Sequence, residues 1–284
     1  MNDSTVNFTI KASSNSTAHS IGKIDILETC MLTFNFISGL PTNAYVIWLI
    51  MTGTGNGVAS EFFNLNLSVC GIFVSVNALL ILASKWFPFQ SLTALTQFFF
   101  GLTVTGHPLF QCLMCVERYL AVVHPVTFLK FKPLRYRVIC CTVAWIFIFG
   151  TCLFCMFSFI SFTIHMYIWF YSLQFLLFLS IQLFCLVAVL RALKQSGPGE
   201  RRGEREEENQ MKRRAFYIIR VITASLVITY VPYIATGLHY LVTLQVIQIL
   251  WSISYICFML AGFVHLALYL HRTGKLFCFC SKND

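Results

Sequence analysis

Charged residues are scarce in this sequence of 284 residues. Asp, Glu, Lys and Arg make up only 11% of the chain, whereas 57% of its residues are hydrophobic. A soluble domain covers its surface with charged and polar residues, so this composition excludes an ordinary soluble protein. Stretches of roughly 18 or more nearly uncharged residues indicate membrane-spanning helices, because about 20 residues rising 1.5 Å each cross the hydrocarbon layer.

Seven stretches of this kind are present, and only a short link near residues 161–165 separates the fourth from the fifth. We therefore expect an all-α membrane protein, with a seven-transmembrane helix bundle over residues 26–270. The expected helices cover approximately residues 26–51, 61–84, 91–120, 137–159, 166–192, 214–240 and 246–270. The stretch at about 194–210 combines mixed charges with glycine and proline, which predicts a mobile inner loop.

Basic residues are nearly absent from one side of these expected helices. Of the 20 Lys and Arg, only Lys11, Lys23 and Lys85 fall on the side that holds the N-terminus, and the other 17 fall on or face the opposite side. Cytoplasmic loops carry the excess of Lys and Arg. This placement predicts a multi-pass cell-membrane protein with an extracellular N-terminus and a cytoplasmic C-terminus. The same placement accounts for the net charge of +9, so this charge does not indicate that the protein binds nucleic acid.

The polar segment 1–25 contains three Asn-x-Ser/Thr sequons, which begin at Asn2, Asn7 and Asn15. In a segment expected outside the cell, they predict a glycosylated extracellular tail. Chance occurrence in a tail rich in Ser, Thr and Asn is the alternative. No apolar signal stretch precedes the tail, so we expect the first helix to act as its own insertion signal.

A set of residues suited to catalysis or to metal binding is also lacking. The histidines are scattered, and only His107 and His265 are expected to lie near each other inside the membrane. Zinc normally needs three or four ligands, and hydrolysis by a nucleophile would need an acid to orient a histidine. We therefore expect no enzyme activity, no cofactor and no bound metal.

A pair of oppositely charged residues lies at the end of the long apolar segment that begins near residue 91. Such a pair is costly unless it meets water at the interface or a polar partner inside the bundle. The sequence Glu117-Arg118-Tyr119, followed by His124-Pro125, resembles the end of the third helix of rhodopsin-like G-protein-coupled receptors. For this segment alone, an ordinary interfacial charge pair is the alternative.

Further matches to the same family follow in order along nearly the whole chain. Gly39-Leu-Pro-Thr-Asn43 is similar to the first helix of the purinergic and protease-activated branch, and Trp86, Trp145, Pro232 and Tyr269 match at compatible spacings. The chain is thus identified as a divergent member of that branch. The resemblance implies a short amphipathic eighth helix and cytoplasmic tail over residues 271–284. Cys278 and Cys280 in that segment are candidates for palmitoylation, with unmodified thiols as the alternative.

The sequence departs from the family at positions associated with activation. Gly71 stands where the second helix usually carries an acid, Tyr230 stands where tryptophan is usual, and His265 replaces the usual asparagine of the seventh helix. Thr93 occupies the usual place of a disulfide-forming cysteine. The residues expected to form the core switch are Gly71, His107, Tyr230, Pro232, His265 and Tyr269.

In the resembled family, an acid, a small polar residue and an asparagine together hold a sodium ion in the middle of the bundle. The matching positions here are Gly71, His107 and His265, and none carries a carboxylate. Sodium prefers oxygen ligands, so this site should reject cations. Gly71 should leave room that the His107 ring fills. Two roles are possible for His107 and His265: they are neutral core residues without a switching role, or their protonation shifts the activation equilibrium.

Arg and Lys are missing from the outer half of the expected helices. Amine ligands need a buried acid, and Phe100 holds the position that supplies it in amine receptors. Phosphate and carboxylate ligands need Arg or Lys, so the sequence predicts a small, neutral, largely apolar or lipid-like ligand. The candidate pocket residues are Gln97, Phe100, Val104, Tyr233, Tyr240, Trp251 and Tyr255. Aromatic packing without a ligand is the alternative.

The resemblance implies a receptor that transmits binding of an extracellular ligand to a heterotrimeric G protein. Glu117, Arg118 and Tyr119 would form the G-protein coupling motif, in which Glu117 holds Arg118 until activation releases it. The alternative is a receptor-like membrane protein that does not signal and acts as a partner subunit or trafficking factor. The expected partners are a G protein, a neutral or lipid-like ligand and membrane lipids, and not nucleic acid.

Overall fold

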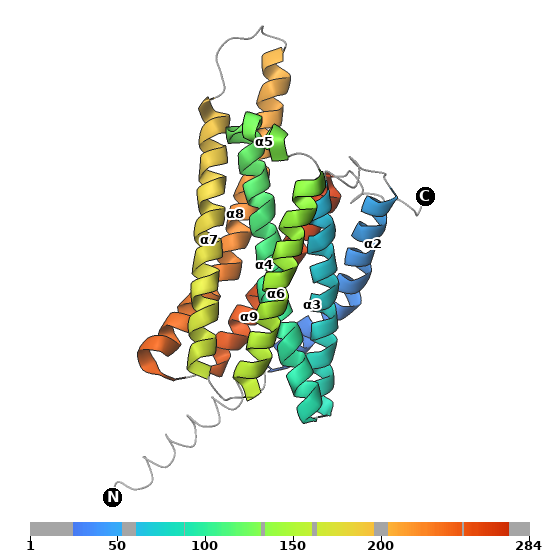
Figure 1. Ribbon diagram of the computed structural model, residues 1–284, viewed down its shortest axis with the longest axis vertical. Coiled ribbons are helices and arrows are strands. Elements are labelled where there is room, and N and C mark those ends of the chain that lie inside the picture. Colours follow the sequence, from blue (N-terminus) through green and yellow to red (C-terminus); the bar gives the residue numbers. More distant parts are fainter. Residues whose placement is uncertain are drawn as a thin grey trace, which may run out of the picture.

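The computed structural model describes residues 25–52, 61–87, 89–131, 134–160, 164–195, 204–245 and 247–272, and all regular structure in these ranges is helical. The elements are η1 Asn35–Gly39, α2 Leu40–Met51, α3 Phe62–Trp86, α4 Gln90–Val123, α5 Pro125–Phe131, α6 Leu134–Ile160, α7 Ile164–Gln195, α8 Glu204–Thr243 and α9 Gln248–Arg272 (Figure 1). Residues 25–34 continue η1 backwards as α-helix. In the described part, seven helices are long and apolar enough to cross a membrane, as expected.

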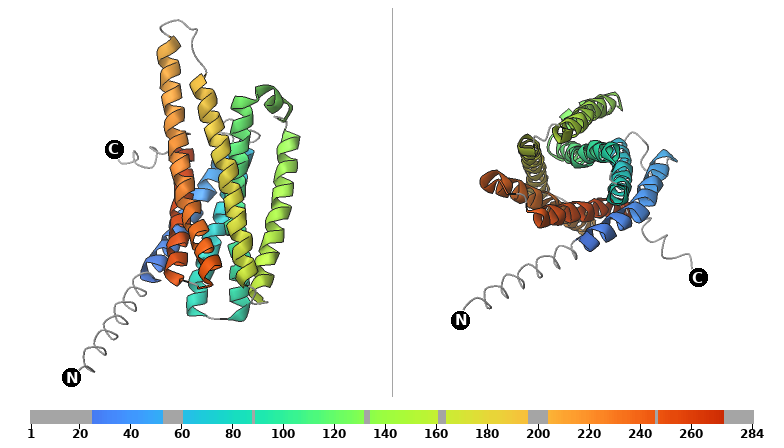
Figure 2. Two further views of the ribbon diagram at one scale, coloured as in Figure 1. Left: turned by 90° about the vertical axis from the view of Figure 1, so that its left-hand side faces the viewer. Right: turned by 90° about the horizontal axis from the view of Figure 1, so that it is seen from below.

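The helices form an up-and-down bundle in which α4 lies toward the middle (Figure 2). It packs against α3, α6 and α7, while α8 packs against α7 and α9. The charge pair of α4 lies near its C-terminal end, at Glu117 and Arg118. We call this end of the bundle the Arg118 end, and the end at which α3 leads into α4 the opposite end.

The helix boundaries refine those expected from the sequence. The link between α6 and α7 lies at residues 161–163, which are outside the described residues, in the place where the apolar run was expected to break. A short helix that was not anticipated, α5, begins at Pro125, which suits a first helical position because proline lacks an N–H. The helix α8 begins at Glu204, so the second half of the expected mobile loop at about 194–210 is helical.

Several predicted features lie outside the described residues. They are the extracellular tail with Asn2, Asn7 and Asn15, the segment from residue 273 onwards that was expected to hold the eighth helix, and the cysteines Cys278 and Cys280. They remain predictions.

A fourth Asn-x-Ser/Thr sequence, Asn66-Leu-Ser68, falls within α3. The Asn66 side chain accepts a hydrogen bond of 2.9 Å from the indole N–H of Trp145.

The first helix contains a π turn, η1, which ends two residues before Pro41. Proline has no N–H to donate and its ring crowds the preceding turn, and a wider turn relieves this crowding. Side chains supply additional bonds here: the Thr42 hydroxyl donates to the carbonyl of Ser38 at 2.6 Å, and the Asn43 amide donates to that of Gly39 at 2.8 Å. The turn therefore fixes Asn43 with its side chain inside the bundle.

The contact between α4 and α6 depends on a glycine. A Cβ atom added at Gly101 would lie 3.0 Å from the backbone Cα of Cys152 and 3.2 Å from the carbonyl oxygen of Thr151. Small residues let helix backbones approach closely in a membrane, where packing rather than the hydrophobic effect holds helices together.

We therefore expect Gly101→Ala to destabilise the bundle by about 1–3 kcal/mol, because the added methyl group meets backbone that cannot rotate away. Gly150→Ala is the matched control, since no atom lies within 4 Å of a Cβ added at that position of α6. Thermal unfolding of the purified chain should show a lower midpoint for Gly101→Ala than for Gly150→Ala. Equal midpoints would mean that the two helices have room to separate.

Candidate functional site

The half of the bundle away from Arg118 contains a packed aromatic cluster. Phe100 of α4 lies between Tyr167 of α7 and Tyr255 of α9, with ring centroids 6.5 and 6.3 Å away. Tyr233 of α8 meets Trp251 of α9, at 6.3 Å between ring centroids. The space that remains among these rings has a volume of about 10 Å³, which suffices for roughly one water molecule.

Four of the seven candidate pocket residues, Phe100, Val104, Tyr233 and Trp251, line this small space. Gln97 lies beside Cys155, 3.9 Å from its sulfur, and Tyr240 pairs with the ring of His165 at 6.2 Å. The structure thus brings most of the expected aromatic residues together, but they fill the space themselves.

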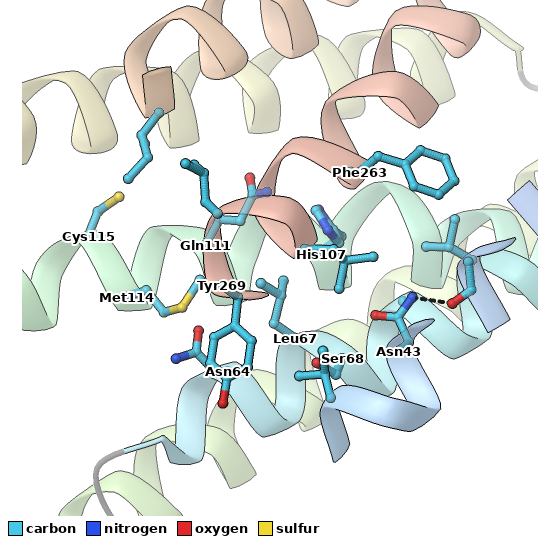
Figure 3. A pocket seen from close by; sticks show the side chains of 18 of the residues that line it. Asn43, Asn64, Leu67, Ser68, His107, Gln111, Met114, Cys115, Phe263 and Tyr269 are labelled. Atoms are coloured by element: carbon cyan, nitrogen blue, oxygen red, sulfur yellow. Dashed lines mark hydrogen bonds between the residues drawn. The ribbon is translucent and has the colours of Figure 1, made fainter. Parts of the chain in front are cut away.

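A much larger cavity, of about 410 Å³, extends from Asn35 and Ser75 to Arg118. Figure 3 shows side chains that line it. We call it the central cavity. Asn43, Ser68 and His107 lie toward one end of it, and Met114 and Cys115 lie toward the other. Arg118 and Val122, both exposed, also line it, so the cavity reaches the surface at the Arg118 end.

The space opposite Gly71 is filled by Asn43. A Cβ atom added at Gly71 would overlap the side-chain amide of Asn43 from the neighbouring helix. The expectation that the His107 ring fills this space was therefore wrong. His107 lines the central cavity instead, and its ring meets the ring of Phe258 at 6.1 Å. The side chain of His265 lies outside the described part, so its pairing with His107 stays a prediction.

Polar groups that carry no charge surround the part of the central cavity near Gly71. The Ser75 hydroxyl donates to the carbonyl oxygens of Gly71 and Asn35, at 3.2 and 3.4 Å. The side-chain oxygen of Asn35 is buried and has no hydrogen-bond partner among the described residues. The described residues that line the cavity include no carboxylate, and nowhere in the described ranges do three or more His, Cys, Asp or Glu side chains gather as metal ligands would.

An ion pair between helices lies beside Arg118. The carboxylate of Glu117 on α4 pairs with the guanidinium of Arg137 on α6, which is only 8% exposed. In the sequence, Arg137 counted only as one of the 17 Lys and Arg expected on or facing the cytoplasmic side. The contact could not be predicted because the two residues lie 20 positions apart on different helices. The hydroxyl of Tyr119 forms a hydrogen bond of 3.1 Å with His124. Arg118 itself lines the mouth of the central cavity.

The expected switch residues divide between two places. Gly71, His107 and Tyr269 line the central cavity. Tyr230 is fully buried in the aromatic core, where its hydroxyl accepts a hydrogen bond of 3.2 Å from the amide of Gln182. The same amide also donates to the carbonyl of Pro108 at 3.2 Å.

Gln182 therefore connects α7 to both α4 and α8, yet sequence reasoning did not single it out. The signal was a glutamine in the middle of an apolar membrane helix, where an amide needs a partner. Six residues beyond Tyr230 on α8, the Thr236 hydroxyl donates to the carbonyl of Pro232 at 2.8 Å and also meets Ser254 of α9 at 2.9 Å.

Seven described helices that are long and apolar enough to cross a membrane, around a cavity with an arginine at its mouth, fit a polytopic membrane protein. The family described as 7 transmembrane receptor (rhodopsin family) matches residues 42–268, which is more than half of the chain. The chain belongs to this family. Its members are receptors and not enzymes, in agreement with the prediction from the sequence.

Individual relatives are distant. The rat uracil nucleotide/cysteinyl leukotriene receptor (Rattus norvegicus) is 27% identical over 127 residues, which are 43% of this chain and 38% of that receptor. Atypical chemokine receptor 3 of the same species is 25% identical over 122 residues, or 41% of this chain and 33% of the relative. Human proteinase-activated receptor 3 (Homo sapiens) is 27% identical over 120 residues, or 40% and 32%. The chain thus aligns with less than half the length of these relatives.

Proposed function

We propose that this chain is a cell-membrane receptor that transmits the binding of an extracellular, neutral and largely apolar ligand to a heterotrimeric G protein. The position of Arg118 carries the proposal. It lies at the mouth of the central cavity, next to a Glu117 carboxylate that is paired with Arg137. A guanidinium offers several N–H donors in a fixed plane, which suits the backbone carbonyls of a protein partner.

The charge distribution supports a neutral ligand. Of the described residues that line either cavity, Arg118 is the one with a permanent charge, and it lies at the end away from the aromatic cluster. An unpaired ionic ligand would lose several kcal/mol of solvation on entering such surroundings. One relative is named for a nucleotide, but the aromatic cluster of this chain offers no basic group to a phosphate.

Replacing Arg118 by alanine is expected to reduce G-protein activation roughly tenfold or more, because hydrogen bonds to a charged group are worth about 1.5–3 kcal/mol each. Surface expression should remain close to normal, since Arg118 is exposed. The assay is G-protein dissociation in cells, with a panel of G proteins. Arg191→Ala, which removes another exposed arginine outside the central cavity, is the control. Normal activation by the Arg118 variant would contradict the proposed role.

A receptor-like protein that does not signal is the second candidate. It is favoured by the residues that replace the family's usual ones at Gly71, Tyr230 and His265, and one relative is named as atypical. The same assay separates the two candidates. Silence of the unmodified chain toward every G protein in the panel, despite normal surface expression, would favour this second function.

The proposed orientation has its own test. With the N-terminus outside and the C-terminus inside, an N-terminal tag should bind antibody on intact cells, whereas a C-terminal tag should bind only after permeabilisation. The expectation rests on the placement of 17 of the 20 Lys and Arg on or facing one side. Labelling of the C-terminal tag on intact cells would refute both the orientation and the proposed coupling.

A further inference from the structure

We propose that the central cavity is a binding site for a small neutral amphiphile, with a hydroxyl or amide N–H group on an apolar body. The site differs from the aromatic cluster that was expected to hold the ligand, and the proposal does not depend on G-protein coupling. Three observations carry it: the volume of the cavity, the lack of a carboxylate among its described lining residues, and a buried acceptor without a partner.

The volume places a ligand in this cavity rather than in the aromatic cluster. Sites for drug-sized ligands usually occupy roughly 300–1,000 Å³. The central cavity, at about 410 Å³, falls within this range, whereas the space among the aromatic rings has only about 10 Å³. Entry is available at the Arg118 end, where the exposed residues Arg118 and Val122 line the cavity.

The lining defines the chemistry of the occupant. Around Gly71 the cavity presents polar side chains, including Asn43, Ser75 and His107. Toward the other end, apolar side chains such as Met114 and Leu186 lie among the polar side chains of Asn64 and Gln111, and Arg118 lines the mouth. No carboxylate among the described lining residues neutralises a cation, and apolar side chains do not solvate an ion. The part around Gly71, which lies away from Arg118, therefore matches a neutral polar head, and the apolar side chains match an apolar body.

The buried Asn35 side-chain oxygen indicates that the polar head of the ligand carries a hydrogen-bond donor. The side-chain oxygen of Asn35 has no hydrogen-bond partner among the described residues, although Asn35 is only 6% exposed and lines the cavity. A buried acceptor left without a donor is unfavourable. A ligand that carries an O–H or N–H group would supply the donor, whereas an ether or a ketone would not.

Photolabelling with a matched pair of probes tests the site. The first probe is a ten-carbon primary alcohol with a photoreactive diazirine in its chain, and the second is its methyl ether, which lacks the donor. Both are added to membranes that contain the full chain, and labelled peptides are mapped. The alcohol should label α4 near Met114 and Cys115, unlabelled 1-decanol should compete, and decylammonium should not.

Two variants link the labelling to the cavity. Asn35→Leu removes the acceptor and should reduce labelling by the alcohol roughly three- to tenfold, as expected for one hydrogen bond, while leaving the weak labelling by the ether unchanged. Met114→Trp should fill the cavity and reduce labelling by both probes. Leu177→Trp, which alters a side chain that is 56% exposed on α7, is the control.

Thermal unfolding of each variant is compared with that of the unmodified chain. A loss of labelling then counts as loss of the site only in a variant that is folded. Labelling confined to exposed side chains such as Leu177 would overturn the proposal. Equal labelling by the alcohol and the ether would overturn it as well, since the Asn35 oxygen would then be satisfied by water alone.

Discussion

Replacing Arg137 by alanine is expected to destabilise the bundle and to weaken signalling. The change leaves the Glu117 carboxylate, whose side chain is only 22% exposed, without its partner from α6. Breaking a buried ion pair in this way costs about 3–5 kcal/mol, and the partial exposure of Glu117 places the expected loss at or below the lower end of that range. Without Arg137, the Glu117 carboxylate would also attract Arg118 more strongly, and this attraction would hold the guanidinium back from a cytoplasmic partner.

Thermal unfolding of the purified chain and G-protein activation in cells measure the two effects. Arg135→Ala is the matched control, because Arg135 precedes Arg137 by two residues and is exposed. Glu117→Gln added to Arg137→Ala should restore much of the stability, since it removes the unpaired charge. If Arg137→Ala unfolds at the same temperature as Arg135→Ala, the ion pair contributes nothing to stability.

The seven helices were predictable because the sequence carries their signal locally. An apolar stretch of sufficient length is visible without any knowledge of its neighbours, and so is a charge pair at its end, as at Glu117 and Arg118. The start of α8 was harder to place. Gly197, Pro198, Gly199 and Gly203 indicated a loop, and all of them precede Glu204, where the helix begins. The Glu, Lys and Arg residues that follow are good helix formers in spite of their charge.

The details of the site depend on which helices cross, and one sequence contains no signal for that. The sequence alone shows that Gly71 replaces the acid usual in the second helix. Only the packing of α2 on α3 shows that the Asn43 side chain fills the space that the acid would occupy. The pairing of Glu117 with Arg137 likewise needs the contact between α4 and α6. The structure brings several of the aromatic candidate residues together near Phe100, but whether such residues enclose a pocket or fill it depends on side-chain packing.

Restoring the family's acid with Gly71→Asp is expected to impair folding. The new side chain would overlap the amide of Asn43, and overpacking of this kind typically costs about 1–3 kcal/mol. Burial of a carboxylate beside the neutral polar lining of the cavity would add to that cost. Surface expression should therefore fall well below that of the unmodified chain. Gly71→Asn has the same size without the charge and should separate the two effects.

Adding Asn43→Ala to Gly71→Asp is expected to recover folding and to create a sodium response that the unmodified chain lacks. The shortened side chain vacates the space next to position 71, and the carboxylate supplies the oxygen ligands and the negative charge that sodium requires. The measurement is the unfolding temperature in sodium chloride against the chloride of a large organic cation. The double variant should be more stable in sodium, whereas the unmodified chain and the Gly71→Asn, Asn43→Ala control should unfold equally in both salts. A sodium response of the unmodified chain would mean that the amides and hydroxyls around Gly71 hold the ion without a carboxylate, and the argument for a neutral cavity would fail with it.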